Sequence, residues 1–114
     1  MSKPINVSQN EFQSEVMESE IPVLVDFHAT WCPPCRALGP ILDRLAAEFA
    51  GQVKFVKINS DEEQQLANRF NVTGLPTVVF IDDGENLGQF AGLPKDDALR
   101  EKIQEWIASR KVAQ

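Results

Sequence analysis

The sequence predicts an α/β fold in which helices cover both faces of a mixed central β-sheet. Strand and helix patterns alternate along most of the chain, in the order β-α-β-α-β-α-β-β-α. Alternation favours parallel pairing early, and an Asp-Gly turn between the last two strand patterns favours an antiparallel hairpin late. The length of 114 residues and the 43% hydrophobic content suit one domain over residues 1–114.

The first strand pattern is short and leads directly into a helix signal. Residues 5–7 are expected to form this strand, and Ser8 and Glu11 then stand at the two ends of a capping box. Val7 and Phe12 have the spacing of the matching hydrophobic staple. Phe12 and Val16, four residues apart, predict an apolar face on this first helix.

The next strand and helix are the strongest patterns in the chain. Residues 21–29, "IPVLVDFHA", are β-branched and nearly continuously apolar, as is typical of a strand covered on both faces. Residues 34–50 have apolar side chains at helical spacing, and Gly51 is the expected stop. Pro40 lies inside this helix and is expected to kink it.

The second half of the chain predicts two more helices and three strands. Residues 53–59 form a strand pattern, and residues 60–63 repeat a capping-box pattern for a helix that is expected to end near Phe70. The hairpin combines the strand pattern "TVVFI" with a shorter one that ends at Phe90. A final helix is expected from about Pro94, with one apolar face formed by Leu99, Ile103, Trp106 and Ile107.

Composition and charge exclude several classes of function. The formal net charge is −6 and no basic cluster is present, so nucleic acid is not an expected partner. No apolar run is long enough to span a membrane, and the N-terminal residues lack the apolar core of a signal peptide. We therefore expect a cytoplasmic protein. In a reducing compartment, its two cysteines are expected to be catalytic or metal-binding.

The stretch "WCPPC" holds both cysteines, three residues apart. Because a proline disfavours helical angles in the residue before it, the helix is expected to begin at Pro34, with Cys32 just outside it. That spacing brings the two Cβ atoms within about 5–6 Å. A disulfide closing so small a ring contributes only about 2 kcal/mol to stability, so it suits a redox switch better than a structural cross-link.

Cys32 is also expected to be reactive. It faces a helix N-terminus, where partial positive charge and the N–H groups of Cys35 and Arg36 favour a thiolate, and the Arg36 side chain adds positive charge. A zinc site is the alternative for any C-x-x-C pair, but His28 is the one histidine in the sequence. A complete site would need a carboxylate or a second chain, so we expect no metal and no other cofactor.

Together, "DFHATWCPPC", "GLPT" and the order of elements resemble the thioredoxin family over essentially the whole chain. The resemblance implies a thioredoxin fold and a protein-disulfide reductase that passes electrons to oxidised protein substrates through a reversible Cys32–Cys35 disulfide. It implies a thioredoxin reductase as a partner, and a role in electron transport and cell redox homeostasis. We expect a monomer.

The resemblance also assigns roles to individual residues. Cys32 would attack the substrate disulfide and Cys35 would resolve the mixed disulfide, which agrees with the thiol inside the helix being harder to reach. Asp26 has apolar neighbours that should raise its pKa, and it would take the Cys35 proton. Lys57 would neighbour Asp26. The alternatives are an ion-paired or capping Asp26 and an ordinary exposed Lys57.

Further residues are implied in substrate binding. Leu75-Pro76 matches the cis-proline loop of the family, whose backbone pairs with an extended substrate segment. A weakly charged contact surface around Cys32 would be formed by Trp31, Pro34, Leu75, Pro76, Ala91, Gly92 and Leu93. Trp31 could instead belong to the core, where Trp106 and Phe27 are expected.

The sequence departs from the common pattern of the family at three positions. Pro33 replaces a glycine, His28 replaces a tryptophan, and Thr30 replaces an acidic residue. Pro33, Pro34, His28 and Arg36 are therefore candidates for tuning the reduction potential, although His28 could be a spectator that fills a gap. A more oxidising oxidase or isomerase and a non-enzymatic binding module are the alternative functions.

Overall fold

The computed structural model describes residues 3–113, and the side chains of residues 3–95 and 97–110. Its elements in chain order are β1 (Ile5–Asn6), α1 (Gln9–Phe12), the π-helical segment η1 (Gln13–Met17), β2 (Val23–His28), α2 (Pro33–Glu48), β3 (Lys54–Asn59), α3 (Gln64–Arg69), β4 (Thr77–Asp82), β5 (Glu85–Ala91) and α4 (Asp96–Ala113). This order confirms the predicted alternation and the late pair of strands.

The strands form one mixed sheet in the spatial order β1-β3-β2-β4-β5. β3 pairs in parallel with both β1 and β2, whereas β4 is antiparallel to β2 and to β5. Asp83 and Gly84 connect β4 to β5 with φ angles of 53° and 78°, the left-handed conformations of a type I′ turn. The Asp-Gly hairpin is therefore confirmed.

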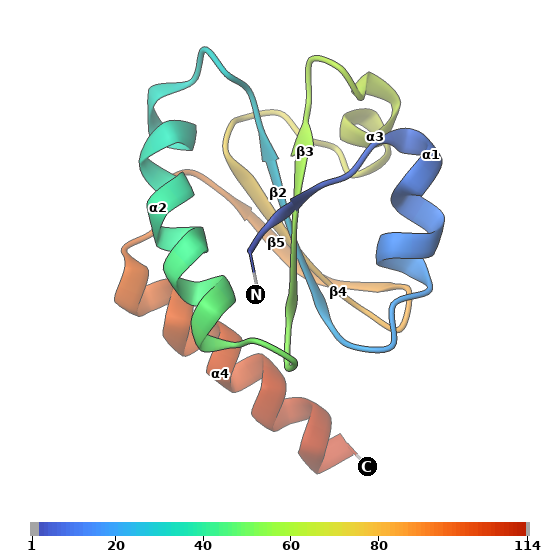
Figure 1. Ribbon diagram of the computed structural model, residues 1–114, viewed down its shortest axis with the longest axis vertical. Helices are drawn as coiled ribbons and strands as arrows, with labels where there is room; N and C mark the ends of the chain where they lie inside the picture. Colours follow the sequence, from blue (N-terminus) through green and yellow to red (C-terminus); the bar gives the residue numbers. More distant parts are fainter. Residues whose placement is uncertain (1–2, 114) are drawn as a thin grey trace.

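Helices cover both faces of the sheet, as predicted (Figure 1). α2 and α4 pack on one face, over a cluster that includes Leu24, Phe55 and Phe80. α1, η1 and α3 pack on the other face, over a cluster that includes Val25 and Phe27. Alternate β2 residues thus enter opposite cores, which explains the nearly continuous apolar sequence of this strand.

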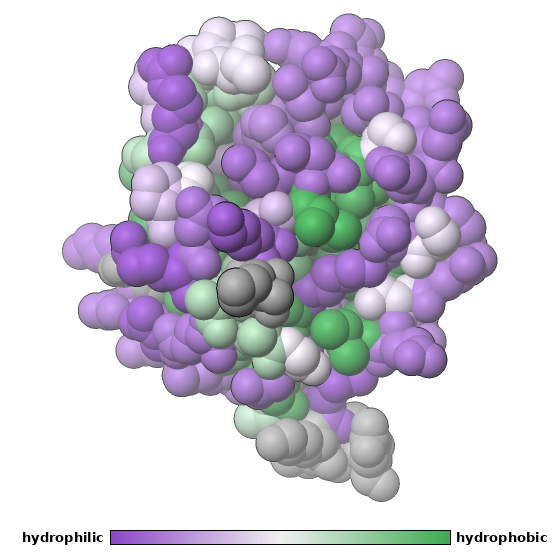
Figure 2. Space-filling view, viewed as in Figure 1, coloured by the Kyte–Doolittle hydropathy of each residue, from purple (hydrophilic) through white to green (hydrophobic). Residues whose placement is uncertain are grey.

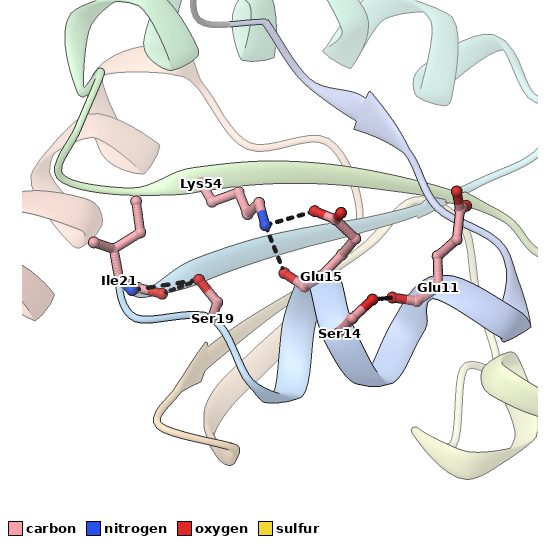
Figure 3. Close-up of polar contacts among 6 residues, drawn as sticks. All are labelled: Glu11, Ser14, Glu15, Ser19, Ile21 and Lys54. Atoms are coloured by element: carbon pink, nitrogen blue, oxygen red, sulfur yellow. Dashed lines mark hydrogen bonds and ion pairs between the residues drawn. The ribbon is translucent and has the colours of Figure 1, made fainter.

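The first helix is joined to the sheet by a lysine. The chain continues from α1 into η1, where Val16 is buried with Phe12 in the same cluster. Lys54 of β3 donates from Nζ to the Glu15 backbone carbonyl at 2.9 Å and to its carboxylate at 2.7 Å (Figure 3). The apolar spacing predicted a helical face here, but nothing in it indicated the π-helical geometry.

Two predicted helix starts are wrong. α2 begins at Pro33 instead of Pro34, because the bias against helical angles before a proline is outweighed when the Arg36 N–H bonds to the Cys32 carbonyl at 3.1 Å. The capping box at residues 60–63 does not form, and α3 begins only at Gln64. Instead, the Glu63 carboxylate accepts the Gln9 N–H at the start of α1, at 2.9 Å.

One face of the described chain is mostly polar. Hydrophilic residues cover most of the face seen in Figure 2, and apolar residues are exposed there only in small separate areas. Among the described residues, no helix combines the length and the apolar character that crossing a membrane requires.

Candidate active site

The two cysteines form a disulfide at the N-terminus of α2, with their Cα atoms 5.2 Å apart. Cys32 is the N-cap residue, and its Sγ accepts the backbone N–H of Cys35 at 3.3 Å. Pro33 and Pro34 have no N–H, so Cys35 provides the first donor of the helix. The Arg36 N–H, in contrast to the prediction, bonds to the Cys32 carbonyl and not to the sulfur.

The dithiol is held from the preceding loop as well. The Cys32 N–H donates to the Ala29 carbonyl at 3.3 Å, and the Arg36 side chain donates from Nη1 to the Thr30 carbonyl at 3.3 Å. This contact fixes the Arg36 guanidinium beside the first turn of α2. Its positive charge therefore lies next to the loop that leads to Cys32.

Exposure does not separate the two cysteines in the disulfide state. Cys32 is 3% exposed and Cys35 is 6% exposed, because both pack with Ala29 and Leu75 in a small cluster. The expectation that Cys32 is the easier one to reach is therefore wrong for this state. The two differ in position instead, since the Cys32 sulfur is the one that faces the helix N-terminus.

Asp26 lies in the middle of β2 and is 1% exposed. In the sheet it pairs with Lys57 of β3 on one side and Val78 of β4 on the other. Burial raises the pKa of Asp26 to about 7, an effect that the Lys57 charge partly offsets. Neither carboxylate oxygen has a hydrogen-bond partner among the described residues. The predicted buried carboxylate and its lysine neighbour are both present.

The loop before β4 lies against the dithiol. The Leu75–Pro76 peptide bond is cis, as the resemblance implied, and Leu75 packs against the cysteines. The Pro76 carbonyl accepts the Gly92 N–H at 2.8 Å, and Thr77 Oγ1 donates to the Gly74 carbonyl at 2.6 Å. These bonds tie the loop to the end of β5 and bring Gly92 to the same edge as Pro76.

Trp31 is on the surface and not in the core. Its side chain is 63% exposed, and its indole Nε1 donates to Asp61 Oδ2 at 2.7 Å. Leu93 is 47% exposed and Pro34 is also exposed, whereas Trp106 is only 8% exposed. The sequence reasoning missed Asp61, which follows β3 and lies 30 residues from Trp31. No local pattern could have indicated that contact.

His28 ends β2, is half-buried and lines the same cavity as Lys57. Burial, together with the positive charge of Lys57, lowers the pKa of His28. Within the described side chains, no group of three or more histidines, cysteines and carboxylates is placed to hold a metal ion.

Comparisons with known proteins point to one family. The family model described as Thioredoxin matches residues 3–105. The chain is 44% identical over 96 residues to a thioredoxin of Haemophilus influenzae, covering 83% of this chain and 90% of the relative. It is 34% identical over 107 residues to thioredoxin 1 of Nostoc sp., covering 94% of this chain and 100% of the relative.

A plant relative is longer. Thioredoxin M4, chloroplastic, of Arabidopsis thaliana is 43% identical over 102 residues, which are 90% of this chain and 53% of the relative. The chain therefore spans about half the length of that protein.

Proposed function

The chain belongs to the thioredoxin family of thiol-disulfide oxidoreductases, and we propose that it reduces disulfide bonds in partner proteins. The observation that carries the proposal is the Cys32–Cys35 disulfide at the N-terminus of α2, where the Cys32 sulfur accepts the N–H of Cys35. A thiolate formed at this position is stabilised by that hydrogen bond and by the helix dipole.

The reduction proceeds in two exchanges. The Cys32 thiolate attacks one sulfur of the substrate disulfide, so that a mixed disulfide forms and one substrate thiolate leaves. Cys35 then gives its proton to Asp26 and attacks the Cys32 sulfur, which releases the second substrate thiolate. The dithiol loses two electrons and the substrate gains them. Protonation of the two substrate thiolates by solvent completes the reaction.

Asp26 is the general base of the second exchange. A base acts best when its pKa lies near the working pH, and burial places the pKa of Asp26 at about 7. Lys57 is the β3 neighbour of Asp26 in the sheet. Its positive charge stabilises the ionised carboxylate and so limits the rise in the pKa of Asp26.

The substrate is held as an extended segment beside Cys32. Leu75, which precedes Pro76 in the loop before β4, offers backbone groups, and strand addition uses such groups for affinity. Trp31, Pro34 and Gly92 are uncharged and provide the surrounding contact surface. A surface of this kind accepts many protein substrates, because backbone pairing does not depend on one sequence.

The partners and setting follow from the reaction. A thioredoxin reductase returns the two electrons, and the protein works as a monomer in a reducing compartment such as the cytoplasm. Residues 1–114 act as one domain, with neither nucleic acid nor membrane as a partner.

Insulin reduction tests the proposal. Reduced protein with dithiothreitol should precipitate insulin faster than dithiothreitol alone, as followed by turbidity. Cys32→Ser should abolish the acceleration, whereas Cys35→Ser should accumulate a mixed disulfide that is visible on non-reducing gels. Wild-type precipitation at the uncatalysed rate would refute the function, and trapping by Cys32→Ser instead would show that the two roles are reversed.

A further inference from the structure

A cavity lined mainly by polar residues lies at the end of β2, and neither cysteine lines it. It has a volume of about 400 Å³ and lies between this end of the sheet, the start of α1 and the segment before α3. Its charged and titratable lining groups are His28, Lys57, Glu11, Glu62 and Glu63. A polar space of this size admits several water molecules, since one needs about 30 Å³.

The proposed reaction leaves a proton on a group that water does not reach directly. Asp26 is 1% exposed, and its oxygens have no partner among the described residues. Each turnover adds the Cys35 proton to this carboxylate. The carboxylate must lose that proton before it can act as a base again.

His28 lines the cavity and follows Asp26 by two positions on β2. Side chains two residues apart on a strand share a face and are separated by about 7 Å, so Asp26 and His28 are next to each other on the face of β2 that α2 covers. His28 lines the cavity, and its Nε2 is buried without a partner among the described residues. A proton crosses a spacing of this length through hydrogen-bonded water and not by direct contact.

We propose that His28 passes the proton from Asp26 to water in this cavity, and so resets the base that the proposed disulfide reduction uses. The inference rests on that function. The proton leaves the Asp26 carboxyl for one ring nitrogen of His28, and the other ring nitrogen releases a proton to the cavity, so no charge accumulates on the ring. His28 acts through Asp26 and is therefore a positioning residue.

The chemistry of the lining favours histidine for this step. A neutral imidazole has one acceptor and one donor, whereas the ammonium of Lys57 has donors only. Burial and the Lys57 charge lower the pKa of His28, which disfavours a proton retained on the ring. Glu11, Glu62 and Glu63 face the cavity and favour a departing proton, while Lys57 disfavours a proton that stays on the ring.

A single-turnover experiment at pH 6 tests the proposal. Because the pKa of Asp26 is about 7, most molecules then hold the proton that must leave before Cys35 can react. Reduced protein is mixed with excess disulfide-bonded peptide, quenched in acid and alkylated, and the remaining thiols are counted by mass. His28→Gln should slow the second exchange about tenfold, less than the ~10²–10⁴-fold of a direct general base. Imidazole buffer should restore the rate, whereas a bulky sulfonate buffer at the same concentration should not.

Three controls separate a relay from a structural role. Asp43→Asn changes an exposed carboxylate of α2 that does not line the cavity, and it should leave the rate unchanged. His28→Trp fills the space without a proton acceptor and should behave like His28→Gln. In a Cys35→Ser background, the mixed disulfide should form at the same rate with and without His28.

The outcomes distinguish failure of the proton relay from failure of the proposed disulfide reduction. Failure of the wild-type protein to reduce insulin refutes the function. If the wild-type protein does reduce insulin, two results refute the relay. One is a wild-type rate of the second exchange at pH 6 that rises with imidazole concentration. The other is a rate in both His28 variants that equals the wild-type rate without imidazole.

Discussion

The raised pKa of Asp26 affects both its role as a base and the stability of the protein. Its pKa rises from 3.8 to about 7 on folding because the carboxylate is buried. Between these values the folded state holds a proton that the unfolded state has lost, so the Asp26 contribution to the free energy of unfolding falls as the pH rises through this range and is constant above it. A shift of about three units corresponds to roughly 4 kcal/mol.

We predict that Asp26→Ala removes this pH dependence. The oxidised wild-type protein should be more stable at pH 5 than at pH 8, and the variant should lose most of the difference, as measured by urea unfolding at both pH values. Asp43→Ala, at an exposed aspartate of α2, should keep the wild-type difference. An Asp26→Ala variant that still loses several kcal/mol between pH 5 and pH 8 would contradict the assignment.

Pro33 provides a second prediction at the level of the single residue. Glycine at this position gives the open dithiol more backbone freedom, worth about 0.4–1 kcal/mol, and should therefore favour the reduced form. The reduction potential of Pro33→Gly should rise by about 10–20 mV, because 30 mV corresponds to about 1.4 kcal/mol. Equilibration with glutathione buffers measures it, and a lower potential would show that the proline does not favour the disulfide.

The chemistry of the site could be predicted residue by residue where it depends on near neighbours. The Cys32–Cys35 spacing and the apolar residues around Asp26 indicated a closable disulfide and a buried carboxylate. The burial of Cys32 could not be predicted, because Leu75 covers it from a distant loop. The Trp31–Asp61 contact depends in the same way on where β3 ends in space.

Among the elements, helix starts were the least predictable features. Apolar periodicity and capping patterns together located the helices, but the patterns at residues 60–63 and at Pro33 misplaced two boundaries. In the first case the glutamate that should cap its own helix caps α1 instead, at Gln9. A capping motif is therefore informative only when its side chain has no better donor elsewhere.

This exchange of partners predicts an effect of Glu63 on α1. Glu63→Ala should lower the free energy of unfolding by about 0.5–1.5 kcal/mol, because the Gln9 N–H loses its acceptor. Urea unfolding measures the loss. Glu62→Ala changes the neighbouring carboxylate and should have little effect, so equal losses in the two variants would argue against the contact.

At the scale of the whole molecule, the position of each strand in the sheet determines how strongly that strand is held. β2 and β3 are hydrogen-bonded on both sides, as is β4, while β1 and β5 lie at the edges. The alternation of elements predicted a mixed sheet with a late hairpin. The placement of β3 between β1 and β2 depends on contacts between distant segments, which local periodicity does not encode.

Hydrogen exchange should follow that order. Amides of β2 and β3 should exchange only when the whole molecule unfolds, whereas amides on the outer side of β5 should exchange through local opening. Mass spectrometry or NMR resolves the two groups. Equal protection of β5 and β2 would mean that the edge strand is covered in solution.

The two tryptophans of the described chain make the molecule its own optical reporter. Trp31 is 63% exposed at the dithiol, whereas Trp106 of α4 is 8% exposed and in edge contact with Phe80. Iodide should therefore quench the red-shifted emission of the first while sparing the second. A docked substrate would shield the indole at the dithiol, and unfolding would shift the emission of the other, so one spectrum can follow both events separately.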